Sequence, residues 1–207
     1  MPGRPPPGRA GRVWLVERAD VARRAAELLD HKQQLLRGEQ RRLSALAERT
    51  GEQWRELAAE ADSWCARALV AGGGDDLRRG AIGARDAHAQ LTWTTQAGVT
   101  YPSTARTELP PLPVLGANVA LTRAADAYRR ALDAAVRHAA ASAAAALVTT
   151  ELTGTTRRLR AIRERWLPDL RAQLDQLDLR VDENEREEIT RLRWARPGSG
   201  ASPEDHP

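Results

Sequence analysis

The sequence has little of what most catalytic and nucleotide-binding sites are made from. Its 207 residues include one cysteine, one lysine, four histidines and no phenylalanine. Because Cys65 is alone, no internal disulfide can form, and a reducing compartment is compatible with the chain. A P-loop needs a Gly-Lys-Ser/Thr step, and the sole lysine, Lys32, lies between His31 and Gln33. The chain therefore lacks that motif.

The histidines and carboxylates form neither a ligand pattern nor a catalytic one. No histidine has a second histidine four residues away or a cysteine pair beside it, which argues against a zinc site. The carboxylates between Asp182 and Glu188 alternate with arginine, as on a solvated or partner-facing helix surface. We therefore predict no catalytic residue, no metal ion and no cofactor.

Long apolar runs are also missing. A membrane span needs roughly 20 apolar residues, whereas the alanine run Ala139–Val148 is shorter and follows Arg137 and His138. The opening stretch MPGRPPPGRAGR has no apolar core of the kind that signal peptides carry. We expect a cytoplasmic protein with no direct membrane insertion.

What the sequence does contain is two narrow apolar stripes at helical spacing. One of them recurs at seven-residue steps near the N-terminus, at Leu15, Ala22, Leu29, Leu36, Leu43, Thr50, Leu57 and Trp64. The other recurs every three or four residues towards the C-terminus, at Leu159, Ile162, Trp166, Leu170, Leu174, Leu177 and Val181. Stripes this narrow suit another helix. The fold class that they predict is mainly α-helical, with a long antiparallel two-helix coiled coil.

Glycine and proline suggest where these helices stop. The first helix is expected to end at Gly72–Gly74, and a short helix to run from Asp75 to about Ala89. Residues 91–103, LTWTTQAGVTYPS, favour a β-hairpin with Gly98 in the turn, or almost equally an extended loop. The predicted organisation is a disordered tail over 1–11, a helix over 12–71, a middle region over 72–115, a helix over 116–196 and a second disordered tail over 197–207.

Three details of these elements are also predicted. Pro102, Pro110 and the prolines after them should prevent regular structure until about Leu115. Pro168 removes the N–H that would bond the carbonyl of Glu164, so a kink is expected there. The buried face in the first half of the second helix is expected at Leu121, Ala124, Tyr128, Leu132, Ala135 and Ala139.

Several motifs carry a resemblance to a known family. In the C-terminal stretch they are Thr155, Arg157-Arg158-Leu159, Ala161, Leu167-Pro168, Val181, Glu183, Glu185-Arg186-Glu187 and Arg191-Leu192-Arg193. Further towards the N-terminus they are Leu28-Leu29, Lys32, Leu36, Gly98-Val99 and Pro102. In order and spacing these resemble the D subunit of V-type and A-type rotary ATPases, although Arg160 and Arg163 stand where the family has Asn and Glu.

The resemblance implies a non-catalytic central-stalk rotor subunit of an ATPase or ATP synthase. Such a subunit transmits torque between ATP chemistry in a catalytic ring and ion translocation in a membrane ring. The implied partners are the ring's catalytic A and regulatory B subunits, the small F subunit of the stalk, and a funnel-shaped subunit above the membrane ring. We hypothesise an interface of Arg157, Arg158, Trp166, Pro168, Glu183, Glu185, Arg186, Arg191, Arg193 and Trp194.

Two other classes of function are weighed against this one. A stand-alone coiled-coil scaffold or adaptor explains the heptads but not the motifs just described. A basic helical binder of nucleic acid is disfavoured, because the net charge of +4 is modest and both signs are interspersed along the helices. We therefore expect no nucleic-acid partner.

Overall fold

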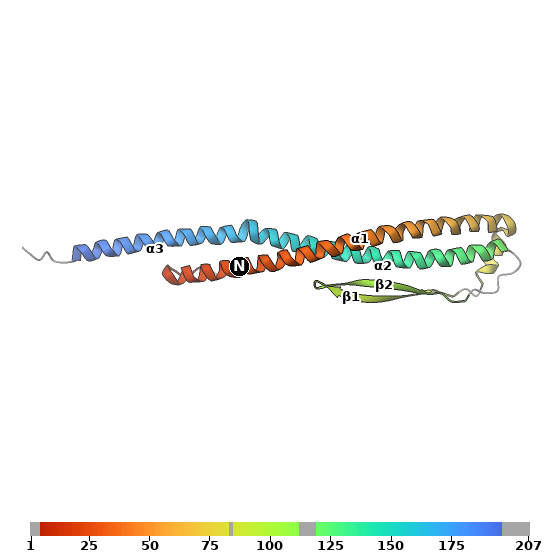
Figure 1. Ribbon diagram of the computed structural model, residues 1–207, viewed down its shortest axis with the longest axis horizontal. Helices are drawn as coiled ribbons and strands as arrows, with labels where there is room; N and C mark the ends of the chain where they lie inside the picture. The colour runs from red at the N-terminus through yellow and green to blue at the C-terminus, as the bar shows by residue number, and fades with distance from the viewer. Residues whose placement is uncertain (1–4, 83–84, 112–118, 196–207) are drawn as a thin grey trace, which may run out of the picture. The chain divides into compact units, whose positions relative to one another are not determined.

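The computed structural model describes residues 5–82, 85–111 and 119–195. Its elements are α1 (Gly8–Gly80), β1 (His88–Gln96), β2 (Val99–Glu108), α2 (Val119–Ala161), the π-helical turn η1 (Ile162–Trp166) and α3 (Leu167–Ala195), as Figure 1 shows. Two long helical segments pack together and an antiparallel hairpin lies between them in the chain. The predicted fold class is therefore confirmed. Helix α1 begins at Gly8, inside the predicted N-terminal tail over 1–11, so that tail is shorter than predicted. The predicted tail over 197–207 lies outside the described residues, and so does the predicted start of the second helix near Gly116.

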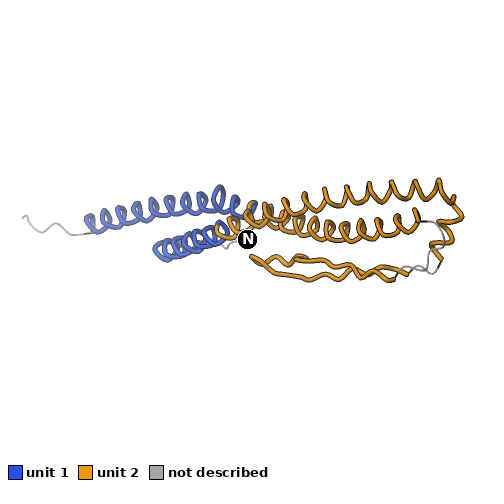
Figure 2. The backbone as a smooth tube through the Cα atoms, turned by 45° about the vertical axis from the view of Figure 1, so that its right-hand side comes forward, with its two compact units in different colours: residues 1–30, 157–207 blue, residues 31–156 orange. Residues whose placement is uncertain are grey.

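The chain divides into two compact units (Figure 2). The first unit, residues 1–30 with 157–207, is an antiparallel helix pair. Arg12 forms an ion pair with Asp178 at 2.8 Å, and Arg163 forms one with Asp30 at 3.2 Å. Its core consists of the buried Leu15, Ala19, Ala22, Leu167 and Leu170, with Trp14, Ile162, Trp166, Leu174 and Leu177 packed against them. Both predicted stripes contribute to this core.

The second unit, residues 31–156, pairs α1 with α2 and carries the hairpin. Its helix contact is made largely of alanine, including Ala61, Ala127, Ala131, Ala134 and Ala144. The predicted face of α2 was partly wrong, because the side chains of Tyr128 and Leu132 are 44% and 42% exposed. Small residues let two helix axes approach closely, so alanines occupy the contact and the larger side chains lie at its flanks.

The high alanine content also changes the hydropathy of this helix. A window of 18 residues within Val119–Trp194 has a mean hydropathy of 1.2, so the stretch is long and apolar enough, by length and composition, to cross a membrane. No uninterrupted apolar run of roughly 20 residues marks this stretch, so the sequence did not predict it. Core helices of proteins outside membranes meet the same criterion, and the alanines of α2 pack on α1.

Helix α1 is broken where the glycine run predicted its end. Gly73 has φ 70° and ψ −178°, which is not helical. Helical structure then resumes but stops at Gly80, short of the predicted Ala89.

The hairpin is present and its register is clear. Gln96 pairs with Val99 around a two-residue turn in which Ala97 and Gly98 have φ of 50° and 77°, as tight hairpin turns require. Contrary to the prediction, Pro102 does not end regular structure, because β2 continues to Glu108. The register shifts between Thr92 and Trp93, and Trp93 pairs with Pro102. A proline is tolerated at such a bulge because the regular ladder is interrupted there.

The distortion expected near Pro168 takes the form of a π-helical turn. Residues Ile162–Trp166 are π-helical, and the N–H of Leu167 bonds the carbonyl of Ile162, five residues back. Proline at 168 offers no N–H to the ladder. Turns of this kind are rare and occur mostly as single insertions within α-helices.

Candidate protein interface

The hairpin is seated on the helix pair by its turn end. Val99 and Tyr101 belong to a buried cluster with Leu36, Leu43, Ala144 and Val148. Tyr101 is only 1% exposed, whereas every residue of β1 is exposed. The hairpin therefore presents one strand to solvent and anchors the other.

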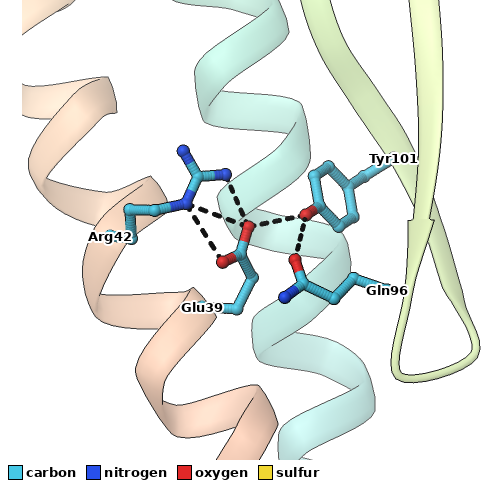
Figure 3. A network of polar contacts seen from close by, with 4 residues as sticks. All are labelled: Glu39, Arg42, Gln96 and Tyr101. Atoms are coloured by element: carbon cyan, nitrogen blue, oxygen red, sulfur yellow. Dashed lines mark hydrogen bonds and ion pairs between the residues drawn. The ribbon is translucent and has the colours of Figure 1, made fainter.

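A polar network adds to this contact between the hairpin and the helices, which we call the seat of the hairpin (Figure 3). The Tyr101 hydroxyl donates to Oε1 of Glu39 at 2.6 Å and lies 3.0 Å from Oε1 of Gln96. Arg42 approaches the same carboxylate from one turn further along α1, with Nε 3.0 Å from Oε2 and Nη2 2.5 Å from Oε1. A hydrogen bond to a charged acceptor is stronger than one between neutral groups, so the network fastens the strand to the helix.

The network also determines the charges of its members. The hydrogen bonds from Arg42 lower the pKa of Glu39, against the raising effect of burial, and the bond from Tyr101 lowers it further. Burial, and then the neighbouring carboxylate of Glu39, raise the pKa of Tyr101. At neutral pH the seat therefore contains a charged Glu39 and a neutral tyrosine that donates to it.

Residues that carried the family resemblance meet at this seat. Lys32 forms an ion pair with Glu151 on α2 at 2.7 Å. A Cβ added to Gly98 in the hairpin turn would lie 3.9 Å from Nζ of Lys32. Leu36 and Val99 both belong to the buried cluster that contains Tyr101. Lys32, Leu36, Gly98 and Val99 therefore share one structural task, which is to hold the hairpin on the helices, whereas Leu28 of the N-terminal motif is exposed.

Further along the same unit, a histidine fills the space left by a glycine. The imidazole of His138 stacks on Trp54 with ring centroids 5.6 Å apart. Its Nδ1 lies 3.1 Å from the carbonyl oxygen of Ala47. A Cβ on Gly51 would come within 2.9 Å of Cε1 of His138, so only glycine leaves room for the ring.

The predicted interface residues all belong to the first unit, but their surroundings differ. Arg157, Arg158 and Pro168 are exposed. Trp166 is half-buried and packs against the core, so its position is that of a packing residue.

The other members lie on the last turns of α3. Glu185 forms an ion pair with Arg9 at 2.8 Å, and Arg191 pairs with Glu187 at 3.1 Å. Figure 1 shows α3 continuing past the start of α1. The large apolar residues on this extension are all exposed, with Ile189 at 52%, Leu192 at 63% and Trp194 at 86%. Six residues of the predicted interface lie on this part of α3, and all are exposed: Glu183, Glu185, Arg186, Arg191, Arg193 and Trp194.

Sequence reasoning missed the contacts of Tyr101 and His138. The available signal was weak in both cases. Glu39 lies three residues after the heptad rung Leu36, at the other apolar position of the seam, and Gly51 directly follows the rung Thr50. A charged residue in a seam, or a glycine beside it, indicates that something other than the partner helix fills the space. Over the described ranges, no group of three or more His, Cys, Asp or Glu residues is placed to hold a metal ion.

Fold and surface together define a class of protein, a two-helix coiled-coil protein that carries a seated hairpin and an exposed C-terminal helix end. Comparison with known sequences identifies the family. The family model that describes the D subunit of ATP synthase matches residues 15–196, and the chain belongs to this family.

Individual relatives agree with this assignment. The chain is 34% identical over 80 residues to the A-type ATP synthase D subunit of Halobacterium salinarum, covering 39% of this chain and 36% of that protein. It is 29% identical over 128 residues to the A-type ATP synthase D subunit of Haloquadratum walsbyi, covering 58% and 55% of the two chains. For the same protein of Haloarcula marismortui, the identity is 31% over 128 residues. These alignments span between about a third and little more than half of the relatives' length.

Proposed function

We propose that this chain is the non-catalytic central-stalk subunit of an A-type or V-type rotary ATPase and transmits torque through its paired helices. The observation that supports this most strongly is the family match over residues 15–196. Two antiparallel helices resist bending and twisting better than one helix does, and transmitting torque requires that resistance. ATP hydrolysis or synthesis would then take place on other chains, and this chain would need no cofactor.

In this proposal the helix pair of the first unit enters the ring formed by the catalytic A and regulatory B subunits. Two features support the assignment: the last turns of α3 expose large apolar residues, and arginine and glutamate alternate around them. Aromatic residues and arginine are enriched where protein interfaces are strongest. Trp194, Arg191 and Arg193 would contact the ring near its bearing, and Arg157 and Arg158 would contact it at the other end of this unit.

The second unit would serve the outer part of the stalk. The small F subunit and the funnel-shaped subunit above the membrane ring would bind there, which makes this chain peripheral to the membrane on its cytoplasmic side. Coupled ion transport, whether proton transport or sodium transport, would be the work of the membrane ring.

The test is reconstitution of the complex with and without this chain, scored by ATP turnover and by rotation of an attached bead. We expect rotation only with the chain present, and no ATP hydrolysis by the chain alone. Reversing the charge of Arg157 and Arg158 should lower coupled turnover. A chain that self-associates and leaves turnover and rotation unchanged would instead be a coiled-coil scaffold, and the proposal would fail.

A further inference from the structure

One half-buried arginine of the first unit, Arg18, has no ion-pair partner for its charge among the described residues. The guanidinium carbon of Arg18 lies 4.8 Å from the ring centroid of Trp14 and 6.0 Å from that of Trp166. Two indoles from different helices therefore hold one cation, which cation–π attraction stabilises.

Nothing in the described part of the chain satisfies this guanidinium by hydrogen bonding. Its Nε is buried and has no hydrogen-bond partner there. Arg12 and Arg163, in the same unit, each form an ion pair with a carboxylate. Arg24 and Arg165 are exposed to water, whereas Arg18 is half-buried. Arg18 is thus a positive charge that is partly removed from water and fixed in place, with no counter-ion within the described ranges.

We propose that Arg18 is a docking point for a carboxylate of the ring that surrounds this helix pair, supplied by an aspartate or glutamate side chain of a ring subunit. The inference rests on the proposed function. The indoles hold the planar guanidinium, whose Nε is enclosed, while the residue as a whole is half-buried and therefore still partly open to solvent. A planar fork of two donors matches the two oxygens of a carboxylate.

The surroundings favour a protein carboxylate over a free phosphate. Phosphate sites usually combine several cations with backbone N–H groups at a helix N-terminus. Arg18 is a single cation in the body of α1, and its guanidinium lies against two aromatic rings. Tryptophan beside a partly desolvated arginine is typical of an interface hot spot. A charge held ready in this way loses little side-chain freedom on binding.

The single lysine of the chain permits a direct test. In a chain carrying Lys32→Arg, which keeps the charge beside Glu151, the substitution Arg18→Lys places a side-chain amine at this one position. The full complex is assembled and treated with a carbodiimide, which joins an amine to a carboxylate in direct contact, and the coupled peptides are identified by mass spectrometry. We expect residue 18 to couple to an aspartate or glutamate of a ring subunit. Arg24→Lys in the same background, an exposed position on the same helix, is the matched control and should couple far less.

A second variant tests the charge itself. Arg18→Gln should weaken binding of the chain to the ring by at least about tenfold, mainly through faster dissociation. In the Arg18→Gln background, replacing the identified ring aspartate or glutamate with its amide (asparagine or glutamine) should weaken binding little further. Thermal melts of the free variants verify that the helix pair still forms.

The outcomes separate this inference from the proposed function. If the wild-type chain does not assemble with the ring, the proposed function fails and the docking point fails with it. If the complex assembles and rotates but residue 18 couples to nothing, or couples only within its own chain, the docking point alone is wrong. Equal coupling at residues 18 and 24 would also overturn it.

Discussion

The hydroxyl of Tyr101 on β2 lies 2.6 Å from Oε1 of Glu39 on α1, although 62 positions separate the two residues in sequence. The hairpin would otherwise be held by few contacts, because all of β1 is exposed and only Val99, Tyr101 and their neighbours reach the core. The charge-assisted hydrogen bond therefore adds a polar link to the apolar cluster that attaches the hairpin to the helices. This makes it the natural place to test whether the hairpin is fixed to the helices.

Tyr101→Phe should destabilise the protein by about 1–2 kcal/mol, because it removes the donor and leaves a buried carboxylate oxygen less satisfied. Urea unfolding followed by circular dichroism measures the change. Tyr128→Phe is the matched control: it also removes a hydroxyl bonded to a carboxylate, at 2.8 Å from Asp62, but from a side chain that is 44% exposed. The control should cost less than about 0.5 kcal/mol. Equal losses for both variants would mean that the buried bond has no special role.

The same network makes stability depend on pH in a defined direction. The hydrogen bonds from Arg42 lower the pKa of Glu39 below its ordinary value of 4.5. A carboxyl whose pKa is lowered by folding stabilises the folded state above its unfolded pKa, and this stabilisation is lost as the pH falls through the folded value. The difference in melting temperature between wild type and Glu39→Gln should therefore be constant near neutrality and shrink as the pH drops below 4.5. Because the Arg42 side chain is 60% exposed, solvent screening keeps the effect small. A melting-temperature difference that stays constant down to about pH 3 would contradict the predicted role of the Glu39 carboxylate.

Sequence periodicity predicted the two helices well, because rungs such as Leu15, Leu36 and Leu43 have to be buried for helices of this length to pair. It failed on α2, where alanines lie on several faces and the pattern does not distinguish the one that contacts α1. It also did not decide between a hairpin and a loop, and it did not predict that β2 continues to Glu108. The choice between strand and loop depends on Tyr101 reaching Glu39, and that contact is set by tertiary structure. Arg18 shows the same limit, since its two indoles come from distant parts of the chain.

Two glycines inside α1 should respond in opposite ways to the same substitution. A Cβ added to Gly38 would meet no described atom within 4 Å, so Gly38→Ala should stabilise the helix by about 0.5–1 kcal/mol. At Gly51 the added Cβ would lie 2.9 Å from Cε1 of His138. Relieving that overlap moves the imidazole from its stack on Trp54. We expect Gly51→Ala to destabilise the protein by about 1–2 kcal/mol despite the gain in helix propensity.

Combining substitutions isolates the cause. In a His138→Ala background the overlap is absent, so Gly51→Ala should stabilise the protein about as much as Gly38→Ala does. Thermal melts of the single and combined variants measure this. A Gly51→Ala variant as stable as Gly38→Ala with His138 present would show that the ring moves without cost.

The π-helical turn before Pro168 makes a mechanical prediction. Pro168 is exposed, so Pro168→Ala restores a backbone N–H without disturbing the core. Proline in a helix interior costs about 3 kcal/mol relative to alanine, and η1 already accommodates part of that cost, so we expect a gain of about 1–2 kcal/mol in thermal stability. The neighbouring Asp169→Ala, also exposed, should change stability by less than about 0.5 kcal/mol.

If the distortion serves the proposed rotor by making the ring's sites inequivalent, the stabilised Pro168→Ala chain should bind the ring normally yet lower coupled ATP turnover in the reconstituted complex. Unchanged turnover would show that the turn accommodates the proline and has no part in coupling.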